Sequence, residues 1–381
     1  MKQRLLILGA SARAAAASAV RGGVEPYAID MFADVDTQQL CECVRCPFED
    51  YPEGLFRLAA NSPPMPWMYT GGLENYPDLI TELAAERPLW GNSAAVLNVV
   101  RDPFALARIG DELGFATPTT VPSDNAPSLP GRWLRKPLNG SGGHGIRVFQ
   151  DGETISDPSR FVLQEYIPGP AMSAIYVSNR THCEIVGVTE QLVGEPWLHA
   201  KPFAYAGNIG PIDVGGVSRQ KLTALGTRLA QRTGLIGVWG IDFILNNGTP
   251  FVIEINPRYT ASVEVFELAS AFRAFDWHNW VFANGPKPTR STTPTQCVGK
   301  AIYYAPQRFT VPTLFAQSCF ADIPEPGSII EAGQPVVTLL RRAASDRVPG
   351  ERRDVSPPGD PEACRRQLAA MAAELDQLLN R

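Results

Sequence analysis

A glycine-rich stretch carries the strongest chemical signal in this sequence. It reads Arg-Lys-Pro-Leu-Asn-Gly-Ser-Gly-Gly-His-Gly over residues 135–145, between two segments of strand character. Glycines at this density let backbone amides converge on the oxygens of a polyphosphate, and Lys136 adds a fixed positive charge. The strands on both sides, and the lack of a match to G-x-x-x-x-G-K-[ST], argue against a P-loop. A flexible glycine hairpin is the alternative interpretation.

A second group of reactive residues follows about a hundred positions later. Asp242 begins a strand pair whose second strand reads Val-Ile-Glu-Ile-Asn-Pro-Arg over residues 252–258. Because strand side chains alternate, Glu254 and Asn256 share a face that Asp242 can reach from the neighbouring strand. Three oxygen donors without His or Cys suit Mg²⁺ held between protein and substrate phosphates. Arg258 keeps the same face and suits a two-point grip on a carboxylate or phosphoryl group.

The composition indicates a globular enzyme that acts on small molecules. The 381 residues are 44% hydrophobic, and 34 Lys+Arg against 39 Asp+Glu give a formal net charge of −5. Scattered rather than clustered basic residues argue against a nucleic-acid partner. The apolar stretches fall short of the ~20 residues of a membrane helix, and Arg13 interrupts the apolar start that a secretory signal would need. We therefore expect a cytoplasmic protein with no membrane partner.

Alternating strand and helix patterns are expected to position these residues. Residues 1–95 repeat a strand-then-helix pattern, which predicts a small α/β domain with a parallel sheet. Its first turn, over residues 9–13, lacks G-x-G-x-x-G, so a dinucleotide site is disfavoured. Two interpretations stay open: a tight structural turn, or a helix N-terminus at which Ser11 and Arg13 receive a carboxylate or phosphate.

The rest of the chain is predicted to be richer in antiparallel strands. Strand-like runs at 133–136, 146–149, 161–167 and 182–193 precede a helix at 219–233 and the strand pair that carries Asp242. After a Pro/Thr-rich linker at 286–294, short strands lead to a final helix at 362–379 with a stripe of apolar side chains: Leu368, Met371, Leu375 and Leu378.

Three of the seven cysteines form C-x-C-x2-C at Cys41, Cys43 and Cys46. They would supply three soft ligands to zinc, but no fourth Cys or His lies nearby to close a tetrahedral site. The pattern favours a plain strand.

All these motifs, in this order and spacing, resemble the ATP-grasp superfamily, which includes D-alanine:D-alanine ligase and biotin carboxylase. The resemblance spans about residues 1–285 and rests on RKPLNGSGGHG, the strand VLQEYIPG and the motif VIEINPR. It implies a mixed α/β and α+β fold. The implied domains are a parallel pre-ATP-grasp α/β domain (1–95), two ATP-grasp subdomains (96–168 and 169–285) and a small β-rich C-terminal domain with a terminal helix (286–381).

The resemblance also implies ATP and Mg²⁺ as cofactors and assigns roles to residues. Lys136 would contact the α and β phosphates, and Arg101 stands where many members have a lysine. The loop closing over the triphosphate would comprise Gly140, Ser141, Gly142, Gly143, His144 and Gly145, and the adenine-reading hinge Gln164, Glu165, Tyr166 and Ile167. The Mg²⁺ ligands would be Asp242, Glu254 and Asn256, and Arg258 would steady the reacting acid. Lys201 resembles a mobile-loop lysine that reaches the γ phosphate, with a solvated loop lysine as the alternative.

The activity implied is ATP-dependent activation of a carboxylate as an acyl phosphate, followed by attack of an amine to give an amide, ADP and phosphate. Joining an amino acid such as glutamate to a small amine or cofactor precursor is one version. A bicarbonate-using carboxylase and a non-catalytic ATP-binding regulator are the alternatives, and a homodimer stays open. Substrate contacts are expected on or beside two loops, 67–75 and 203–211, through Tyr69, Glu74, Tyr205 and Asn208.

Overall fold

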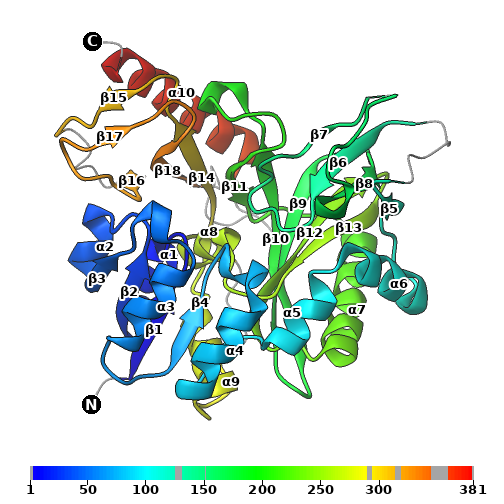
Figure 1. Ribbon diagram of the computed structural model, residues 1–381, viewed down its shortest axis with the longest axis horizontal. Coiled ribbons are helices and arrows are strands. Elements are labelled where there is room, and N and C mark those ends of the chain that lie inside the picture. Colours follow the sequence, from blue (N-terminus) through cyan, green and yellow to red (C-terminus); the bar gives the residue numbers. More distant parts are fainter. Residues whose placement is uncertain are drawn as a thin grey trace, which may run out of the picture.

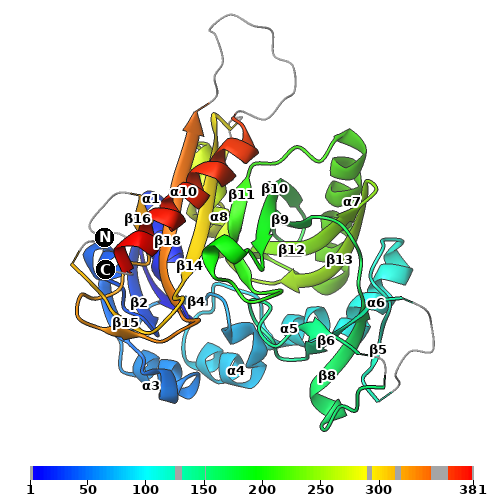
Figure 2. The ribbon, with the colours of Figure 1, turned by 90° about the horizontal axis from the view of Figure 1, so that it is seen from above.

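The computed structural model describes residues 3–124, 131–150, 152–289, 294–313, 319–344 and 359–379. Three larger sheets and one two-stranded sheet organise this part of the chain (Figures 1 and 2). The first sheet forms an α/β unit at the N-terminal end, and the other two larger sheets are antiparallel.

The first sheet is parallel, with strand order β3-β2-β1-β4. The residues of the run 5–8 are fully buried, as expected for a parallel strand covered on both faces by helices. The strands are β1 (Arg4–Leu8), β2 (Glu25–Asp30), β3 (Glu42–Arg45) and β4 (Trp67–Tyr69). The helices are α1 (Arg13–Arg21), α2 (Val35–Leu40), α3 (Glu53–Ala60) and α4 (Pro77–Glu86), with short 3₁₀ turns η1 (Phe48–Asp50) and η2 (Leu73–Asn75).

The second sheet is small and antiparallel, in the order β5-β8-β6-β7, and its β6–β7 connection is the glycine-rich loop. Its strands are β5 (Thr120–Pro122), β6 (Trp133–Pro137), β7 (Arg147–Val148) and β8 (Phe161–Glu165), with η3 (Pro158–Arg160). Helices α5 (Ala94–Val100) and α6 (Pro103–Leu113) lead into it. Helix α6 begins at Asp102, whose side chain accepts the Phe104 amide, and ends at Gly114 in a left-handed conformation.

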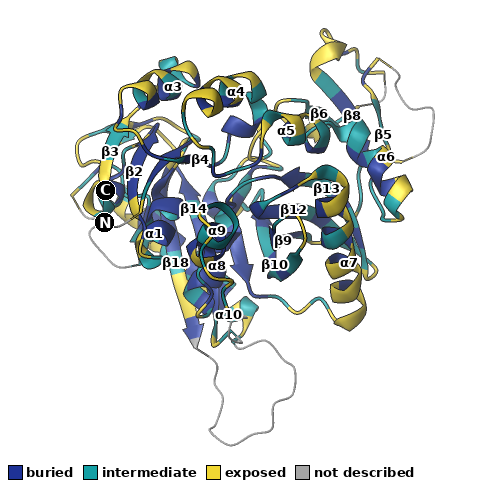
Figure 3. Ribbon diagram, turned by 90° about the horizontal axis from the view of Figure 1, so that it is seen from below, coloured by how far each residue is buried: buried dark blue, intermediate teal, exposed yellow. Residues whose placement is uncertain are grey.

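The third sheet has eight strands in the order β13-β12-β9-β10-β11-β14-β18-β16. Its strands are β9 (Ala171–Ser178), β10 (Cys183–Val193), β11 (Tyr205–Gly210), β12 (Gly237–Asn246), β13 (Thr249–Asn256), β14 (Gln296–Tyr304), β16 (Phe320–Ala321) and β18 (Pro335–Ala344). The accompanying helices are η4 (Pro196–Leu198), α7 (Gly216–Thr233), α8 (Ala261–Ala269), α9 (Ala274–Phe282) and α10 (Pro361–Leu379), and β15 (Phe309–Thr310) pairs with β17 (Ile329–Ile330). Much of the large sheet is dark blue in Figure 3, whereas α7 turns a yellow, exposed side to solvent.

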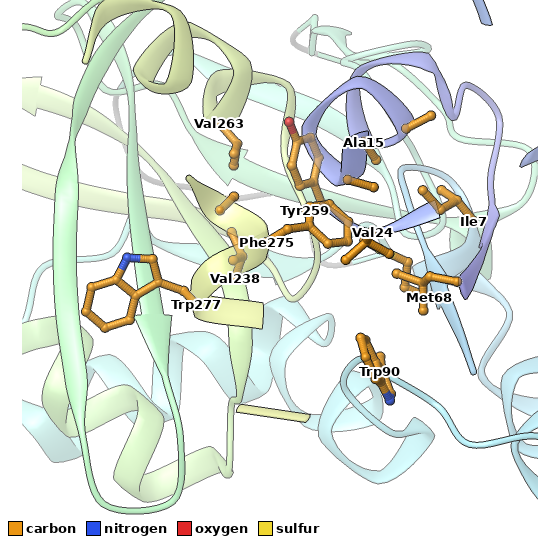
Figure 4. Packing of buried hydrophobic residues seen from close by; sticks show 14 of the residues in the cluster. Ile7, Ala15, Val24, Met68, Trp90, Val238, Tyr259, Val263, Phe275 and Trp277 are labelled. Atoms are coloured by element: carbon orange, nitrogen blue, oxygen red, sulfur yellow. The ribbon is translucent and has the colours of Figure 1, made fainter. Parts of the chain in front are cut away.

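One apolar cluster joins the parallel sheet to the large sheet (Figure 4). Ile7 and Met68 from the first unit pack in the same core as Val238 of β12 and Phe275 of α9, with Trp90 at its edge. The first unit is therefore fixed against the strand that carries Asp242.

Two parts of the chain differ from the sequence expectation. The segment 203–211 was expected to be a loop, yet Tyr205–Gly210 is strand β11, paired with both β10 and β14. The strands after residue 286 extend the large sheet through β14, β18 and β16. Short, Gly-rich segments such as YAGNIG lack the apolar alternation that marks a strand, so only the two flanking strands reveal it.

The terminal helix α10 lies on β14 and β18, with Cys364, Leu368 and Leu375 buried and Leu378 43% exposed. No helix within the described ranges is long and apolar enough to cross a membrane. The parallel first unit followed by antiparallel sheets confirms the predicted mixed α/β and α+β fold class.

Candidate functional site

Three side chains, which we call the carboxylate face (Asp242, Glu254 and Asn256), meet at the β12–β13 pair. Asp242 lies directly opposite Glu254, and Asn256 Nδ2 donates to Asp242 Oδ2 at 2.9 Å. Like charges directly opposite each other are destabilising. Burial and the charge of Glu254 raise the pKa of Asp242 to about 6, against hydrogen bonds from Ser173, Asn256 and Gln191. The arrangement therefore favours a cation between the two strands.

Arg101 connects the carboxylate face to the glycine loop. Its guanidinium pairs with Glu254 and donates to Asn75 Oδ1 at 3.1 Å and to the Gly140 carbonyl at 3.4 Å. Burial lowers the pKa of Arg101, but the charges of Glu254 and Glu74 outweigh it and leave that pKa above the usual value. The Arg101 guanidinium thus links the glycine loop, strand β13 and η2.

Lys136 lies on β6 and has no carboxylate in direct contact within the described structure. Its Nζ donates to Gln164 Oε1 at 3.0 Å, and Gln164 Nε2 donates to Thr120 Oγ1 at 3.1 Å. Burial lowers the pKa of Lys136, although the nearby charge of Glu254 opposes the shift. Because the Lys136 ammonium is removed from water and has only an amide partner, it is suited to bind an anionic ligand.

The predicted adenine hinge, residues 164–167, spans the end of β8. The Glu165 carboxylate accepts bonds from Thr119, and the Tyr166 amide donates to the Arg132 carbonyl at 2.8 Å. The Arg132 guanidinium stacks on the Tyr166 ring at 4.6 Å, while Ile167 lies just beyond the strand. The hinge is thus anchored on its side toward β6.

The glycine loop is docked onto the segment that precedes β11. The Tyr205 amide donates to the Gly142 carbonyl at 2.9 Å. Gly143 has φ +76°, and a Cβ there would lie 1.9 Å from the Phe203 carbonyl oxygen. Gly145 also has a positive φ, +79°, whereas the Ser141 and His144 side chains lie at the exposed turn of the loop. Only glycine permits this close approach of two backbones.

Arg258 is held by a buried carboxylate from the first unit. Its Nε and Nη2 donate to Glu74 Oε1 at 2.9 and 2.7 Å, Nη2 also to Asn256 Oδ1 at 3.2 Å, and Nη1 to the Tyr259 carbonyl at 3.2 Å. Burial disfavours the ionised form of Glu74, yet Arg258 and Arg101 keep the pKa of Glu74 below its ordinary value. Four of the five guanidinium N–H groups are engaged. In this arrangement one N–H of Arg258 remains for a ligand, and the two-point grip expected from the sequence stays a prediction.

Arg13 belongs to a second set of charges, which we call the Arg13 network (Arg13, Glu264, Lys300 and Asp322). Arg13 is 3% exposed and donates to both Glu264 oxygens and to Asp322 at 3.0 and 3.1 Å. Lys300 Nζ donates to Glu264 Oε2 at 2.7 Å. Burial opposes ionisation of Glu264, but Arg13 and Lys300 hold its pKa well below the ordinary value. The donors of Arg13 bind two protein carboxylates, which favours the structural interpretation of this turn, and binding of a substrate anion by Arg13 stays a prediction.

The remaining predicted substrate residues are dispersed. Ser11 is exposed beside α1, and the Tyr69 hydroxyl is buried against the Asn92 carbonyl at 2.8 Å. Tyr205 and Asn208 bond each other on strand β11 rather than on a loop, and Asn208 is 1% exposed.

Lys201 is exposed and lines a surface hollow of about 460 Å³. Within the described residues, no hydrogen bond or ion pair links it to the carboxylate face. Its phosphate-binding role stays a prediction.

Several residues that contact the predicted site residues were not predicted from the sequence. Asn75 binds Arg101, and Ser173 and Gln191 bind Asp242. The adjacency of Asn75 to Glu74 was a weak signal, whereas Ser173 and Gln191 lie on separate strands and carried none. As for zinc, Cys43 lies on β3, and no group of three or more His, Cys, Asp or Glu residues that could hold a metal occurs in the described residues.

Comparison with known proteins points to one superfamily. Residues 101–262 match the family model of the ATP-grasp domain. An uncharacterised protein of Methanocaldococcus jannaschii is 24% identical over 264 residues, which cover 66% of this chain and 63% of that protein. This chain therefore spans slightly less than two thirds of that relative.

Two solved structures share the fold. The L-amino acid ligase of Bacillus licheniformis has a TM-score of 0.69 at 16% identity, over 99% of this chain and 97% of that one. The biotin carboxylase domain dimer of the Hydrogenobacter thermophilus 2-oxoglutarate carboxylase, in complex with MgADP, ADP and bicarbonate, has a TM-score of 0.68 at 14% identity, over 95% and 88%. The family model and these neighbours agree with ATP and Mg²⁺ as the predicted cofactors.

Proposed function

We propose that this chain, in which residues 101–262 match the family model of the ATP-grasp domain, is an ATP-dependent, ADP-producing ligase that joins a carboxylate to an amine through an acyl phosphate. The observation that carries the proposal is the cross-strand pair of Asp242 and Glu254, with Asn256 beside it and Lys136 nearby. This set offers both the cation site and the fixed positive charge that phosphoryl transfer needs.

The residues of the carboxylate face fit Mg²⁺. All three offer hard oxygen donors, and two carboxylates facing each other are stabilised by a divalent cation. Asp242, Glu254 and Asn256 would hold the ion, and when bound it supplies charge neutralisation for the transferring phosphoryl group. Arg101, already on Glu254, would keep that carboxylate directed toward the site.

The nucleotide would lie between the two antiparallel sheets. Lys136 exchanges its neutral Gln164 partner for phosphate oxygens, and the backbone amides of 140–145 line the same side. Residues 164–167 would offer backbone groups to adenine. The bond between Gly142 and Tyr205 shows that the loop can rest against β11, where it excludes water from a reactive acyl phosphate.

Arg258 would act on the reacting acid with one N–H rather than as its counter-ion. Glu74 already neutralises its charge, so most of the substrate's negative charge falls to Lys136 and the metal. No protein nucleophile is required, because the substrate carboxylate attacks phosphorus itself and the amine then displaces phosphate.

We further propose small-molecule substrates, an amino acid such as glutamate as the acid and a small amine or cofactor precursor as the acceptor. We also propose the domain division 1–95, 96–168, 169–285 and 286–381, in which the last two parts contribute strands to one sheet. A bicarbonate-using carboxylase is the second candidate, favoured by the likeness to a carboxylase domain complexed with bicarbonate.

The test is ADP release with Mg-ATP across a panel of amino acids and amines, with and without bicarbonate, and with hydroxylamine to trap an acyl phosphate. Hydroxamate formed by the wild type and lost in Glu254→Ala supports the ligase. ADP release that requires bicarbonate supports the carboxylase. Tight ATP binding without substrate-stimulated ADP release from any pair would overturn both and leave a nucleotide-binding regulator.

A further inference from the structure

Asn92 is a buried amide whose hydrogen bonds converge on the segment that carries Arg258. It lies between Trp90 and helix α5 and is 1% exposed. Its Nδ2 donates to the Ile236 carbonyl at 3.0 Å and to the Pro257 carbonyl at 2.9 Å, and its Oδ1 accepts the Ile236 amide at 2.9 Å. Three of its four hydrogen-bonding positions are thus filled by backbone groups.

The Pro257 carbonyl depends mainly on Asn92. The Tyr69 hydroxyl lies 3.4 Å from it, but the same hydroxyl lies only 2.8 Å from the Asn92 carbonyl. A hydroxyl has one proton, so Tyr69 donates chiefly to Asn92. Asn92 Nδ2 is therefore the principal donor to the peptide group that joins Pro257 to Arg258.

That peptide group sets the direction in which Arg258 leaves the sheet. The Arg258 amide donates to the Asn256 carbonyl at 2.8 Å, which closes a three-residue turn around Pro257. Turning the Pro257 carbonyl would turn the Arg258 amide with it, because both belong to one planar unit. Asn256 of the carboxylate face and Arg258 flank this single turn.

The surroundings of Asn92 have room for about one water molecule. A cavity of about 10 Å³, roughly the space of one water molecule, adjoins Asn92, Pro257 and Arg258. His278 also lines this cavity, its Nε2 lies 3.0 Å from the Trp90 carbonyl, and burial lowers the pKa of His278 to about 4. A shortened side chain at position 92 would therefore leave the Pro257 carbonyl without a protein donor of comparable geometry.

We propose that Asn92 is a positioning residue for phosphoryl transfer: by clamping the Pro257 carbonyl to β12 it directs Arg258 onto Glu74 and toward the reacting acid, without touching substrate. The proposal rests on the proposed function of Arg258. With this role for Asn92, the short connection between the parallel sheet and α5 does more than join two units.

Asn92→Asp is the decisive variant, since it keeps the shape and the acceptor for the Ile236 amide but puts a carboxylate oxygen, which repels the Pro257 carbonyl, in place of the amide donor. We expect kcat for substrate-dependent ADP release to fall by about 10- to 100-fold, the effect of a small misplacement of a reacting group, with ATP affinity within twofold of wild type. Asn246→Ala is the matched control, because it removes an Asn-to-backbone bond (to the Pro168 carbonyl, 2.8 Å) at the other end of β12. It should change kcat by less than twofold.

A double-mutant comparison separates positioning from general damage. In an Arg258→Ala background, adding Asn92→Asp should lower kcat by less than a further twofold, because its route of action is already gone. Losses that multiply in the double variant overturn the proposal.

A crystal structure of Asn92→Asp tests the inference without any activity. The expected result is a turned Pro257 carbonyl and a guanidinium of Arg258 that has left Glu74, and an unchanged turn with Arg258 still on Glu74 overturns it. If the wild type ligates nothing, the proposed function fails, whereas this structural outcome still decides the role of Asn92.

Discussion

The Arg13 network and the carboxylate face are two sets of buried charge in one molecule, and they differ in how the charges are matched. In the Arg13 network, Arg13 and Lys300 both contact Glu264, and Asp322 contacts Arg13. In the site, Lys136 contacts the neutral amide of Gln164, and Asp242 contacts the amide of Asn256.

The pKa shifts follow the same division. Opposite charges hold the pKa of Glu264 well below its ordinary value despite burial, so the ionised form is favoured. Burial instead raises the pKa of Asp242 and lowers the pKa of Lys136, so both are pushed toward their neutral forms. The matched network links units of the chain, whereas the unmatched groups of opposite sign are those that the proposed Mg²⁺ and phosphate sites would use.

The largest effect is expected from breaking the matched network. Arg13→Met leaves Asp322 without its ion pair and Glu264 with Lys300 alone, in a buried site, which should lower the free energy of unfolding by about 3–5 kcal/mol. Urea denaturation measures it. Arg57→Met, which breaks an exposed ion pair to Asp50, is the control and should change it by at most about 1 kcal/mol. Equal effects of the two variants would show that the network does not hold the units together.

The next effect concerns Glu254 of the carboxylate face, which pairs with Arg101. Glu254→Gln keeps the shape of the side chain but removes the negative charge of a proposed metal ligand. We therefore expect kcat to fall about 100- to 1,000-fold. In this variant the Mg²⁺-dependent part of ADP affinity, measured by calorimetry with and without the metal, should disappear. Glu49→Gln, at an exposed 3₁₀ turn, is the control. Full activity of Glu254→Gln would remove Glu254 from the metal site.

A smaller effect is expected where the glycine loop meets β11. Gly143→Ala would place a methyl group 1.9 Å from the Phe203 carbonyl, so the loop must shift, and we expect ATP affinity to fall about tenfold, or about 1.4 kcal/mol. Gly152→Ala has nearly the same φ, +77°, and no atom within 4 Å of the new Cβ. Gly152→Ala therefore measures the effect of backbone strain without a clash between the loop and the Phe203 carbonyl. An equal loss of ATP affinity in both variants would refute the role of Gly143 in docking the loop.

The smallest effect is the pH dependence of Asp242. With a pKa of about 6, it is about one quarter ionised at pH 5.5 and almost fully ionised at pH 7.5, so Mg²⁺-dependent ADP affinity should rise about fourfold between them. Since the pKa of Asp242 in the folded chain exceeds the ordinary value of 3.8, the metal-free folded chain binds more protons than the unfolded chain between about pH 4 and 6. Stability therefore falls as pH rises through that window. Asp242→Asn should remove this contribution, and a slope identical to wild type would exclude Asp242 as its source.

The motifs and most element boundaries of this protein were predictable from sequence, because they depend on local periodicity. The parallel first sheet, the flanked glycine loop and the β12–β13 pair with its alternating donors all follow from residues close in the chain. Strand β11 was missed because its Gly-rich sequence has no strand pattern of its own, and only pairing with β10 and β14 makes it one.

By itself, then, the sequence determined which residue types stand at which spacing: a lysine before a glycine loop, and three oxygen donors and an arginine on one strand pair. Tertiary structure decided their partners. Glu74 reaches Arg258 across 184 positions, and Glu264 reaches Arg13 across 251. A charged side chain carries no local signal of its partner, since Coulomb and hydrogen-bond interactions act through space. The same residue type is thus a cation paired with two carboxylates at Arg13 and a nearly saturated donor beside the proposed site at Arg258.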